Sequence, residues 1–492
     1  MLGIKENDKS FEINNFYVIF FVIIFLRCEV DMTKVQIFTD KDQLGFLGFP
    51  NAIKANGLVF TSGVRSKPKN KRDRNFSEMS QEYREKEQGF SLVDEFEGKV
   101  CHDAAHAHTA LQELLELCGS DSTQILRQHM WQRDKRFFPA YENIRKKVQT
   151  VPAPSSGLGV EYVFGDQEGS IGLDAIAVCP NESSLYPQRE VITKLDNKKL
   201  PSAGFYSQAV KTGDLVFTAG HIPIKTSTEG MPVVTSFNDI PVEGRFLATG
   251  RSHPDSRDGP IAAQAWYTYN ELKRTLENHD VQLSDTINST VYLTDIRDFP
   301  VFHRIHTHFF PENGPALTVI GFSEVGHRGC LIEIELTAVK TLNNSKIERV
   351  DWPVKPPFNA PAANITDNLI FLSGICGLGE DGTIFSSEKN STEINYPNNF
   401  AQILTIDSEL VGQTWCAFNI ISDITKKAGS SMDNLLKISV YVKDQKDFEI
   451  FQKVFSSLVS KENFPALECV IIPKPGPTEN ARIQIEAIAS KI

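Results

Sequence analysis

A short apolar run that ends in a turn occurs three times along the chain. It is GLVFTSG at 57–63, DLVFTAG at 214–220 and NLIFLSG at 368–374. Runs of β-branched and aromatic residues bounded by glycine are typical of buried strands. Self-similarity at a nearly constant long spacing indicates internal repeats. The pattern therefore predicts three copies of one structural unit.

Two further patterns recur at the same spacing. A middle pattern leads from an apolar strand through Asp into a helix start, at HMWQRDKRFF (129–138), TVYLTDIRDF (290–299) and SVYVKDQKDF (439–448). A closing strand follows, at SIGLDAIAV (170–178), LIEIELTAV (331–339) and RIQIEAIAS (482–490). Each copy thus carries an opening, a middle and a closing signature.

Between the opening and middle signatures, apolar residues follow the 3.6-residue period of an amphipathic helix. They are Ala104, Leu111, Leu114, Leu115 and Cys118, then Ala265, Tyr269, Leu272 and Leu276, then Ala417, Ile421, Ile424 and Ala428. A second helix is expected after each middle strand. The order β-β-α-β-α-β-β predicts an α+β fold with helices on one face of a sheet. We place the repeats at 32–185, 195–342 and 353–492.

Four segments fall outside this repeated pattern. Polar inserts after the opening strands cover 66–97, 225–258 and 379–410, and loops of such length are often functional or disordered. We interpret 1–31 as a leader or a misassigned start. Its apolar stretch has 11 residues, whereas a membrane-spanning helix needs about 20, so we expect no membrane span. The roles of these segments stay open.

Composition narrows the functional classes. The 492 residues are 41% hydrophobic and 23% charged, with a net charge of −11, which argues against nucleic acid as the main partner. Eight cysteines without a CxxC pair suit reduced thiols, so we expect a cytoplasmic protein. No nucleotide-binding or hydrolase motif occurs, and the His102–His106 pair is a weak zinc signal because zinc needs three or four convergent ligands. We therefore predict no cofactor and no metal.

The second repeat resembles a known family. GFYSQAVKTGDLVFTAGHIP (204–223), together with its middle and closing signatures, is similar to the YjgF/RidA family, also called L-PSP proteins. The resemblance covers nearly all of 44–490 in three copies. It implies a chorismate-mutase-like fold, trimer assembly with a pocket between neighbours, and hydrolysis of reactive enamines and imines. For one chain with three copies it implies a monomeric intramolecular pseudotrimer that acts on a small molecule.

The resemblance, together with the polar residues of the first repeat, suggests site residues. Tyr206 and Glu335 are expected to be catalytic, together with Arg133 from the first repeat. The substrate-binding residues are expected to be Gly220, Ser207, Ser155, Ser156, Gly374, Cys469 and Glu486. Any pocket would be composite, with residues from two repeats.

One family feature is missing. The family holds its substrate carboxylate with the Arg of a Pro-Ala-Arg motif, since a planar guanidinium binds a carboxylate through two hydrogen bonds. Aligned by that motif, this chain has Pro154, Leu317 and Leu467 at the Arg position. Arg133 with Ser155 and Ser156 is the candidate for a relocated anion site.

The residues leave three functions open. The first is binding of small enamine, imine or 2-oxo acid metabolites in pockets between repeats, with hydrolysis of 2-imino acids at one of them. The second is a non-catalytic metabolite sensor or a holdase-like protein, which the missing Arg favours. The third is RNA cleavage through the basic run 67–75, which the acidic net charge disfavours.

Overall fold

A computed structural model of the protein describes residues 34–39, 48–66, 90–166, 168–191, 204–226, 228–248, 258–312, 314–340, 347–390 and 396–491. All of them belong to one compact unit, Thr33–Ile492. The expected leader 1–31, the basic run 67–75 and most of the insert 66–97 lie outside the described residues.

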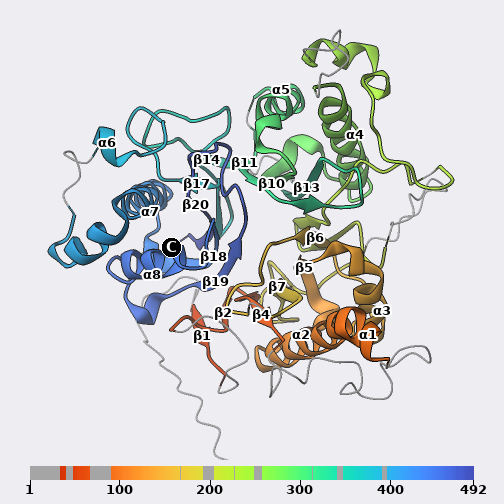
Figure 1. Ribbon diagram of the computed structural model, residues 1–492, viewed down its shortest axis with the longest axis horizontal. Helices are drawn as coiled ribbons and strands as arrows, with labels where there is room; N and C mark the ends of the chain where they lie inside the picture. The colour runs from red at the N-terminus through yellow and green to blue at the C-terminus, as the bar shows by residue number, and fades with distance from the viewer. Residues whose placement is uncertain are drawn as a thin grey trace, which may run out of the picture. The chain divides into compact units, whose positions relative to one another are not determined.

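The described chain forms three mixed sheets (Figure 1). The first sheet has the order β1 (Val35–Ile37), β2 (Ala52–Ala55), β3 (Leu58–Thr61), β7 (Ile171–Val178), β5 (Ile125–Gln132), β6 (Ser155–Gly159) and β12 (Glu324–Val325), with β4 (Val64–Arg65) beside β7. The second has the order β11 (Ala316–Gly321), β10 (Thr286–Leu293), β13 (Ile332–Val339), β9 (Leu215–Thr218) and β8 (Ala209–Thr212). The third has the order β14 (Glu348–Val350), β15 (Ala363–Thr366), β16 (Leu369–Leu372), β20 (Ile483–Ser490), β18 (Leu435–Val442) and β19 (Ala466–Ile471), with β17 (Ile375–Cys376) beside β20.

Two main helices accompany each sheet and pack against each other (Figure 1). They are α2 (Lys99–Leu117) with α3 (Phe138–Val148), α4 (Asp258–Glu277) with α5 (Phe299–Phe309), and α7 (Ala401–Lys427) with α8 (Asp447–Phe455). Short α1 (Ser91–Val93) precedes α2, and α6 (Ser387–Asn390) precedes α7. Each sheet with its helices has the predicted core order β-β-α-β-α-β-β.

Strand register places equivalent residues of the three sheets in equivalent positions. In each sheet the middle strand is parallel to one neighbour, β6, β11 or β19, and antiparallel to the closing strand. His129 lies opposite Asp174, Thr290 opposite Glu335, and Ser439 opposite Glu486. The three acids of the closing signatures therefore occupy the same place in their sheets.

The apolar residues separate into helix-side cores and shared cores. The helix stripes pack on one face of their own sheet, as Leu111 does in the first, Leu272 in the second and Ile421 in the third. The opposite faces of the three sheets contribute jointly to two further clusters. One contains Phe60, Phe217 and Phe371, and the other contains Trp131, Tyr292 and Tyr441. Side chains alternate between the two faces of a strand, so each sheet contributes to both kinds of core.

The inserts contain regular structure where they are described. The insert 379–410 includes α6 and the first turns of α7, which kinks at Asp407 (φ −158°, ψ 86°). Asp407 Oδ1 accepts a hydrogen bond from Leu410 N at 3.0 Å and so caps the second part of the helix. The insert 225–258 includes 3₁₀ turns at Phe237–Asp239 and Val242–Leu247. Within the described residues, no helix combines the length and apolar content needed to cross a membrane.

Candidate functional site

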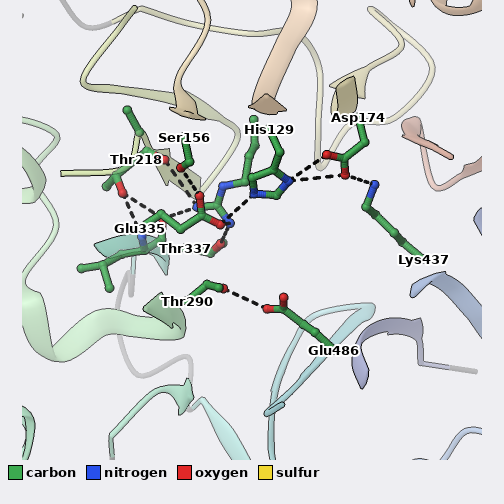
Figure 2. Close-up of polar contacts among 12 residues, drawn as sticks. His129, Ser156, Asp174, Thr218, Thr290, Glu335, Thr337, Lys437 and Glu486 are labelled. Atoms are coloured by element: carbon green, nitrogen blue, oxygen red, sulfur yellow. Dashed lines mark hydrogen bonds and ion pairs between the residues drawn. The ribbon is translucent and has the colours of Figure 1, made fainter. Parts of the chain in front are cut away.

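A buried polar network links the first and second sheets (Figure 2). Glu335 on β13 receives hydrogen bonds from Ser156 Oγ and, at 3.0 Å, from His129 Nε2. Its carboxylate also lies 3.5 Å from the guanidinium of Arg127, which donates to Leu336 O at 2.7 Å. The structure thus brings together two expected site residues, Glu335 and Ser156, and surrounds the carboxylate with donors.

The same network continues into the third sheet (Figure 2). His129 Nδ1 lies 3.0 Å from Asp174, and Asp174 lies 2.5 Å from Lys437 Nζ. Glu486 accepts a hydrogen bond from Thr290 Oγ1 at 2.9 Å. Equivalent positions of the three sheets therefore meet here, but with different side chains.

Within this network, His129 and Glu335 stabilise each other's charged forms. Burial alone would lower the pKa of His129, but the Glu335 and Asp174 carboxylates raise it to about 10. Burial opposes ionisation of Glu335, yet Arg127 and His129 lower its pKa to about 2. Burial, together with the nearby Glu335 charge, raises the pKa of Glu486. Glu335 is therefore ionised and paired with Arg127 and His129. Its expected catalytic role stays a prediction.

The first–second junction is the place where β6 meets Gly220, which follows β9. Gly220 N donates to Ser155 O at 3.3 Å. A Cβ at Gly220 would lie 2.0 Å from Glu333 Oε1 and 2.7 Å from Ser156 Oγ. The acid that touches this glycine is thus Glu333, which the sequence analysis did not name. The closing signature LIEIELTAV contains both acids, but only Glu335 has an acidic counterpart in the other repeats.

Glu333 has a different environment from Glu335. Its Oε2 accepts a hydrogen bond from Gly326 N at 2.9 Å, and its side chain is buried. Burial raises the pKa of Glu333 to about 7, although the nearby Lys135 charge opposes this rise. Lys135 Nζ donates to Gly157 O, and burial lowers the pKa of this ammonium group. A carboxyl group that titrates near neutral pH can act as a general acid and base.

Strand register corrects the motif alignment in the first repeat. Leu317 pairs with Ser289 in the second sheet, and Leu467 pairs with Ile438 in the third. In the first sheet, Gln128 holds the position equivalent to Ser289 and Ile438, and it pairs with Ser155. The prediction that Pro154 holds the Arg position was therefore wrong by one residue. In the first repeat, strand pairing begins two residues after the Ala of the Pro-Ala motif, at Ser155. In the other two repeats it begins at that Ala itself, Ala316 or Ala466.

A guanidinium does reach Ser155, but from a helix. Arg145 of α3 donates from Nη1 to Ser155 Oγ at 3.0 Å and from Nε to Gln149 at 3.0 Å. Arg145 is buried, and its nearest carboxylate is Glu142 at 3.8 Å. Sequence reasoning missed this residue because it lies outside the aligned strands.

Ser207 and Tyr206, which were expected from the second repeat, lie near this junction. Ser207 N donates to Ala153 O at 3.2 Å and Ser207 Oγ to Pro152 O at 2.7 Å, so Ser207 contacts the segment before β6. Tyr206 is half-buried next to Gly204. Arg133 lies elsewhere, in the turn after β5, with its guanidinium over the Tyr162 ring at 5.6 Å. Ser155 pairs at the opposite end of β6, so Arg133 and Ser155 do not form the expected anion site.

The third–first junction is filled by an ion pair. Gly63 N donates to Leu467 O at 3.0 Å, and a Cβ at Gly63 would lie 1.9 Å from Glu468 Oε2. The Glu468 carboxylate lies 2.5 Å from Arg65 Nη2, and both side chains are nearly inaccessible to solvent. The neighbouring Cys469 is buried, and burial raises the pKa of its thiol. The space beside this glycine is thus occupied by the protein's own side chains.

The second–third junction is open. Gly374 N donates to Leu317 O at 3.1 Å, and Gly374 lines a cavity of about 730 Å³. Gln484 holds the position that Glu333 holds in the second sheet. Its amide nitrogen donates to Val319 O at 3.1 Å and to Pro475 O at 2.8 Å. This junction therefore has a neutral, hydrogen-bonded amide where the first–second junction has a titratable acid.

Comparison with known proteins agrees with this repeated architecture. A family model described as Endoribonuclease L-PSP matches residues 246–340 and 354–491. A RutC family protein of Pyrococcus abyssi is 30% identical over 137 residues, which are 28% of this chain and 87% of the relative. A 2-iminobutanoate/2-iminopropanoate deaminase of Dermatophagoides farinae is 26% identical over 153 residues, 31% of this chain and 97% of the relative.

Among solved structures, RidA from the Antarctic bacterium Psychrobacter sp. is 24% identical, with 31% of this chain and 99% of that chain covered and a TM-score of 0.24. Most of the length of the two sequence relatives, 87% and 97%, thus matches less than a third of this chain. The two segments matched by the family model fit a tandem arrangement. The chain belongs to the YjgF/RidA family of L-PSP and RutC proteins.

Proposed function

We propose that this protein binds a small carboxylate-bearing metabolite in the cavity beside Gly374. The cavity itself carries the proposal. At about 730 Å³ it falls within the range of about 300–1,000 Å³ that is usual for small-molecule sites, and it opens beside a junction glycine. Binding without hydrolysis is favoured at this junction, because Gln484 cannot exchange a proton and Leu317 offers no guanidinium.

The same proposal includes an intramolecular pseudotrimer with repeats at 32–185, 195–342 and 353–492. Its support is one backbone hydrogen bond found at all three junctions, from Gly63 to Leu467, Gly220 to Ser155 and Gly374 to Leu317. Tethered copies have a high effective concentration for one another, and one chain can make its three junctions different. Light scattering should then give the monomer mass of 55.0 kDa. A stable trimer of full chains would contradict the pseudotrimer.

Hydrolysis of 2-imino acids at the first–second junction is a second candidate, and Glu333 favours it. Water must add to the C=N carbon, and the nitrogen must take up protons before ammonia leaves. A carboxyl group with a pKa of about 7 can give and accept those protons near neutral pH. Arg145 and Lys135 are the nearby cations, and Tyr206 remains an expected additional contributor.

Two measurements separate these functions. Calorimetry with 2-oxobutanoate tests binding, and loss of freshly generated 2-iminobutanoate tests hydrolysis. Gly374→Val should abolish binding, because a side chain there would meet Gln484 and Thr318 within 3 Å. Glu333→Gln should abolish hydrolysis and leave binding intact. A matched control is Gly314→Ala, whose Cβ would have ordinary contacts of 3.5 Å. Binding that is unaffected by Gly374→Val would overturn the proposed site.

A further inference from the structure

The cavity beside Gly374 has an aromatic wall formed by a residue of α5 and a residue of the segment before β15. Phe299, at the start of α5, and Phe358, which precedes β15, are both half-buried and both line the cavity. Their ring centroids are 6.0 Å apart with the planes at 71°. Half-buried rings that line a cavity present flat apolar surface to whatever fills it. Aromatic ligands pack favourably on such surfaces in offset or edge-to-face geometry.

Packing behind the wall fixes these rings in place. Phe358 meets Trp352 edge-on at 5.8 Å, and Trp352 is anchored by a hydrogen bond from Nε1 to Ala360 O at 2.8 Å. Phe299 also contacts the His303 ring at 5.5 Å. The wall is therefore preorganised, which reduces the ordering cost of binding.

The charged residues of the cavity leave one cation available. Arg482 is held between Asp407 at 2.7 Å and Asp447 at 3.1 Å, so its guanidinium is already neutralised. Two carboxylates also line the cavity: Glu409 accepts a hydrogen bond from Ser387 N at 2.8 Å, and Glu479 pairs with Lys474 at 3.7 Å. Lys443 lines the cavity, is exposed, and forms no ion pair with another residue in the part of the chain that the structure describes. A single ammonium group matches a single negative charge.

We infer that this cavity takes an aromatic monocarboxylate, with its ring against Phe299 and Phe358 and its carboxylate at Lys443. This inference rests on the proposed binding function and narrows its ligand class. Aliphatic 2-oxo acids would meet the same ammonium group but would leave the aromatic wall uncovered.

The test is calorimetry on the full-length chain with three probes: phenylpyruvate, 2-oxobutanoate and phenyl phosphate. Phenylpyruvate should bind about tenfold or more tightly than 2-oxobutanoate, and more tightly than phenyl phosphate. Lys443→Ala should weaken phenylpyruvate binding about tenfold, while Lys443→Arg should retain most of it. Phe299→Leu and Phe358→Leu should weaken phenylpyruvate but not 2-oxobutanoate. The matched control is Lys446→Ala, an exposed lysine already paired with Asp444 at 3.3 Å.

The outcomes distinguish this inference from the function on which it rests. Equal affinity for phenylpyruvate and 2-oxobutanoate, or tighter binding of phenyl phosphate, would overturn the aromatic carboxylate and leave a metabolite site. Unchanged phenylpyruvate affinity in Lys443→Ala would overturn the assigned anchor. No binding of any probe would overturn both the inference and the proposed function.

Discussion

Glu333 and Glu335 lie on the same face of β13, yet their surroundings shift their pKa values in opposite directions. Burial raises the pKa of Glu333 to about 7. Burial acts on Glu335 as well, but Arg127 and His129 overcome it and lower the pKa to about 2. The two carboxyl groups are thus suited to different tasks: Glu335 holds the network together, whereas Glu333 can change its protonation state.

The stability of the protein should fall as pH rises through the range in which Glu333 ionises. Its folded pKa of about 7 exceeds its ordinary value of 4.5, so the folded state binds the extra proton between these values. Glu333→Gln should remove this loss. Denaturant unfolding should show the variant more stable than the wild type by on the order of 1–3 kcal/mol at pH 8, with the difference vanishing near pH 4. Glu449→Gln on the exposed face of α8 is the control, and parallel pH curves for Glu333→Gln and wild type would contradict the assignment.

His129 should produce a pH dependence in the alkaline range. Its folded pKa of about 10 lies above the ordinary 6.5, so its stabilising charge is fully present below pH 6.5 and is lost as pH rises through 10. His129→Gln leaves two buried carboxylates without this cation and should cost about 3–5 kcal/mol at pH 6.5. That cost should shrink towards pH 10 in urea titrations. A cost that is independent of pH would show that His129 is neutral in the folded protein.

Each junction brings one strand backbone against a glycine, and the strands keep this contact although the side chains around it differ. A Cβ would lie 1.9 Å from Glu468 at Gly63, 2.0 Å from Glu333 at Gly220 and 2.8 Å from Gln484 at Gly374. Substitution by alanine should therefore destabilise the protein by about 1–3 kcal/mol at each site. Thermal unfolding of the three variants beside Gly314→Ala checks this. Stability equal to that of the control would show that the junctions are loosely packed.

The order of strands and helices could be predicted because hydrophobic period and turn residues determine it locally. The amphipathic stripes, such as Leu272 and Leu276 on α4, are buried as expected. Register and facing could not be predicted, because they depend on backbone pairing between segments distant in sequence. Ser155 rather than Pro154 occupies the motif position for this reason. Glu333 was missed because residues i and i+2 of a strand face the same way, and only the neighbouring sheet distinguishes them.

The three sheets share two hydrophobic cores, and we therefore expect them to unfold cooperatively. Ile53, Phe217 and Phe371 belong to one cluster, although they come from three different sheets. Removing one sheet would expose apolar surface on the other two. Each Å² of apolar surface exposed to water costs about 25 cal/mol of free energy. Independent unfolding of single repeats is therefore unfavourable, even though each sheet also has a core of its own beneath its helices.

Leu436→Ala tests this cooperativity, because Leu436 is fully buried on β18 but belongs to the shared cluster. The substitution should cost about 2–5 kcal/mol. Since the cluster is common, hydrogen exchange should accelerate together in β5, β10 and β18, and calorimetry should keep a single transition with equal calorimetric and van't Hoff enthalpies. Ile424→Ala on α7, within the core of the third sheet alone, provides the comparison. If hydrogen exchange in Leu436→Ala accelerated only in β18 and its own sheet, the repeats would unfold as separate units. The shared clusters would then hold the sheets in contact without coupling their unfolding.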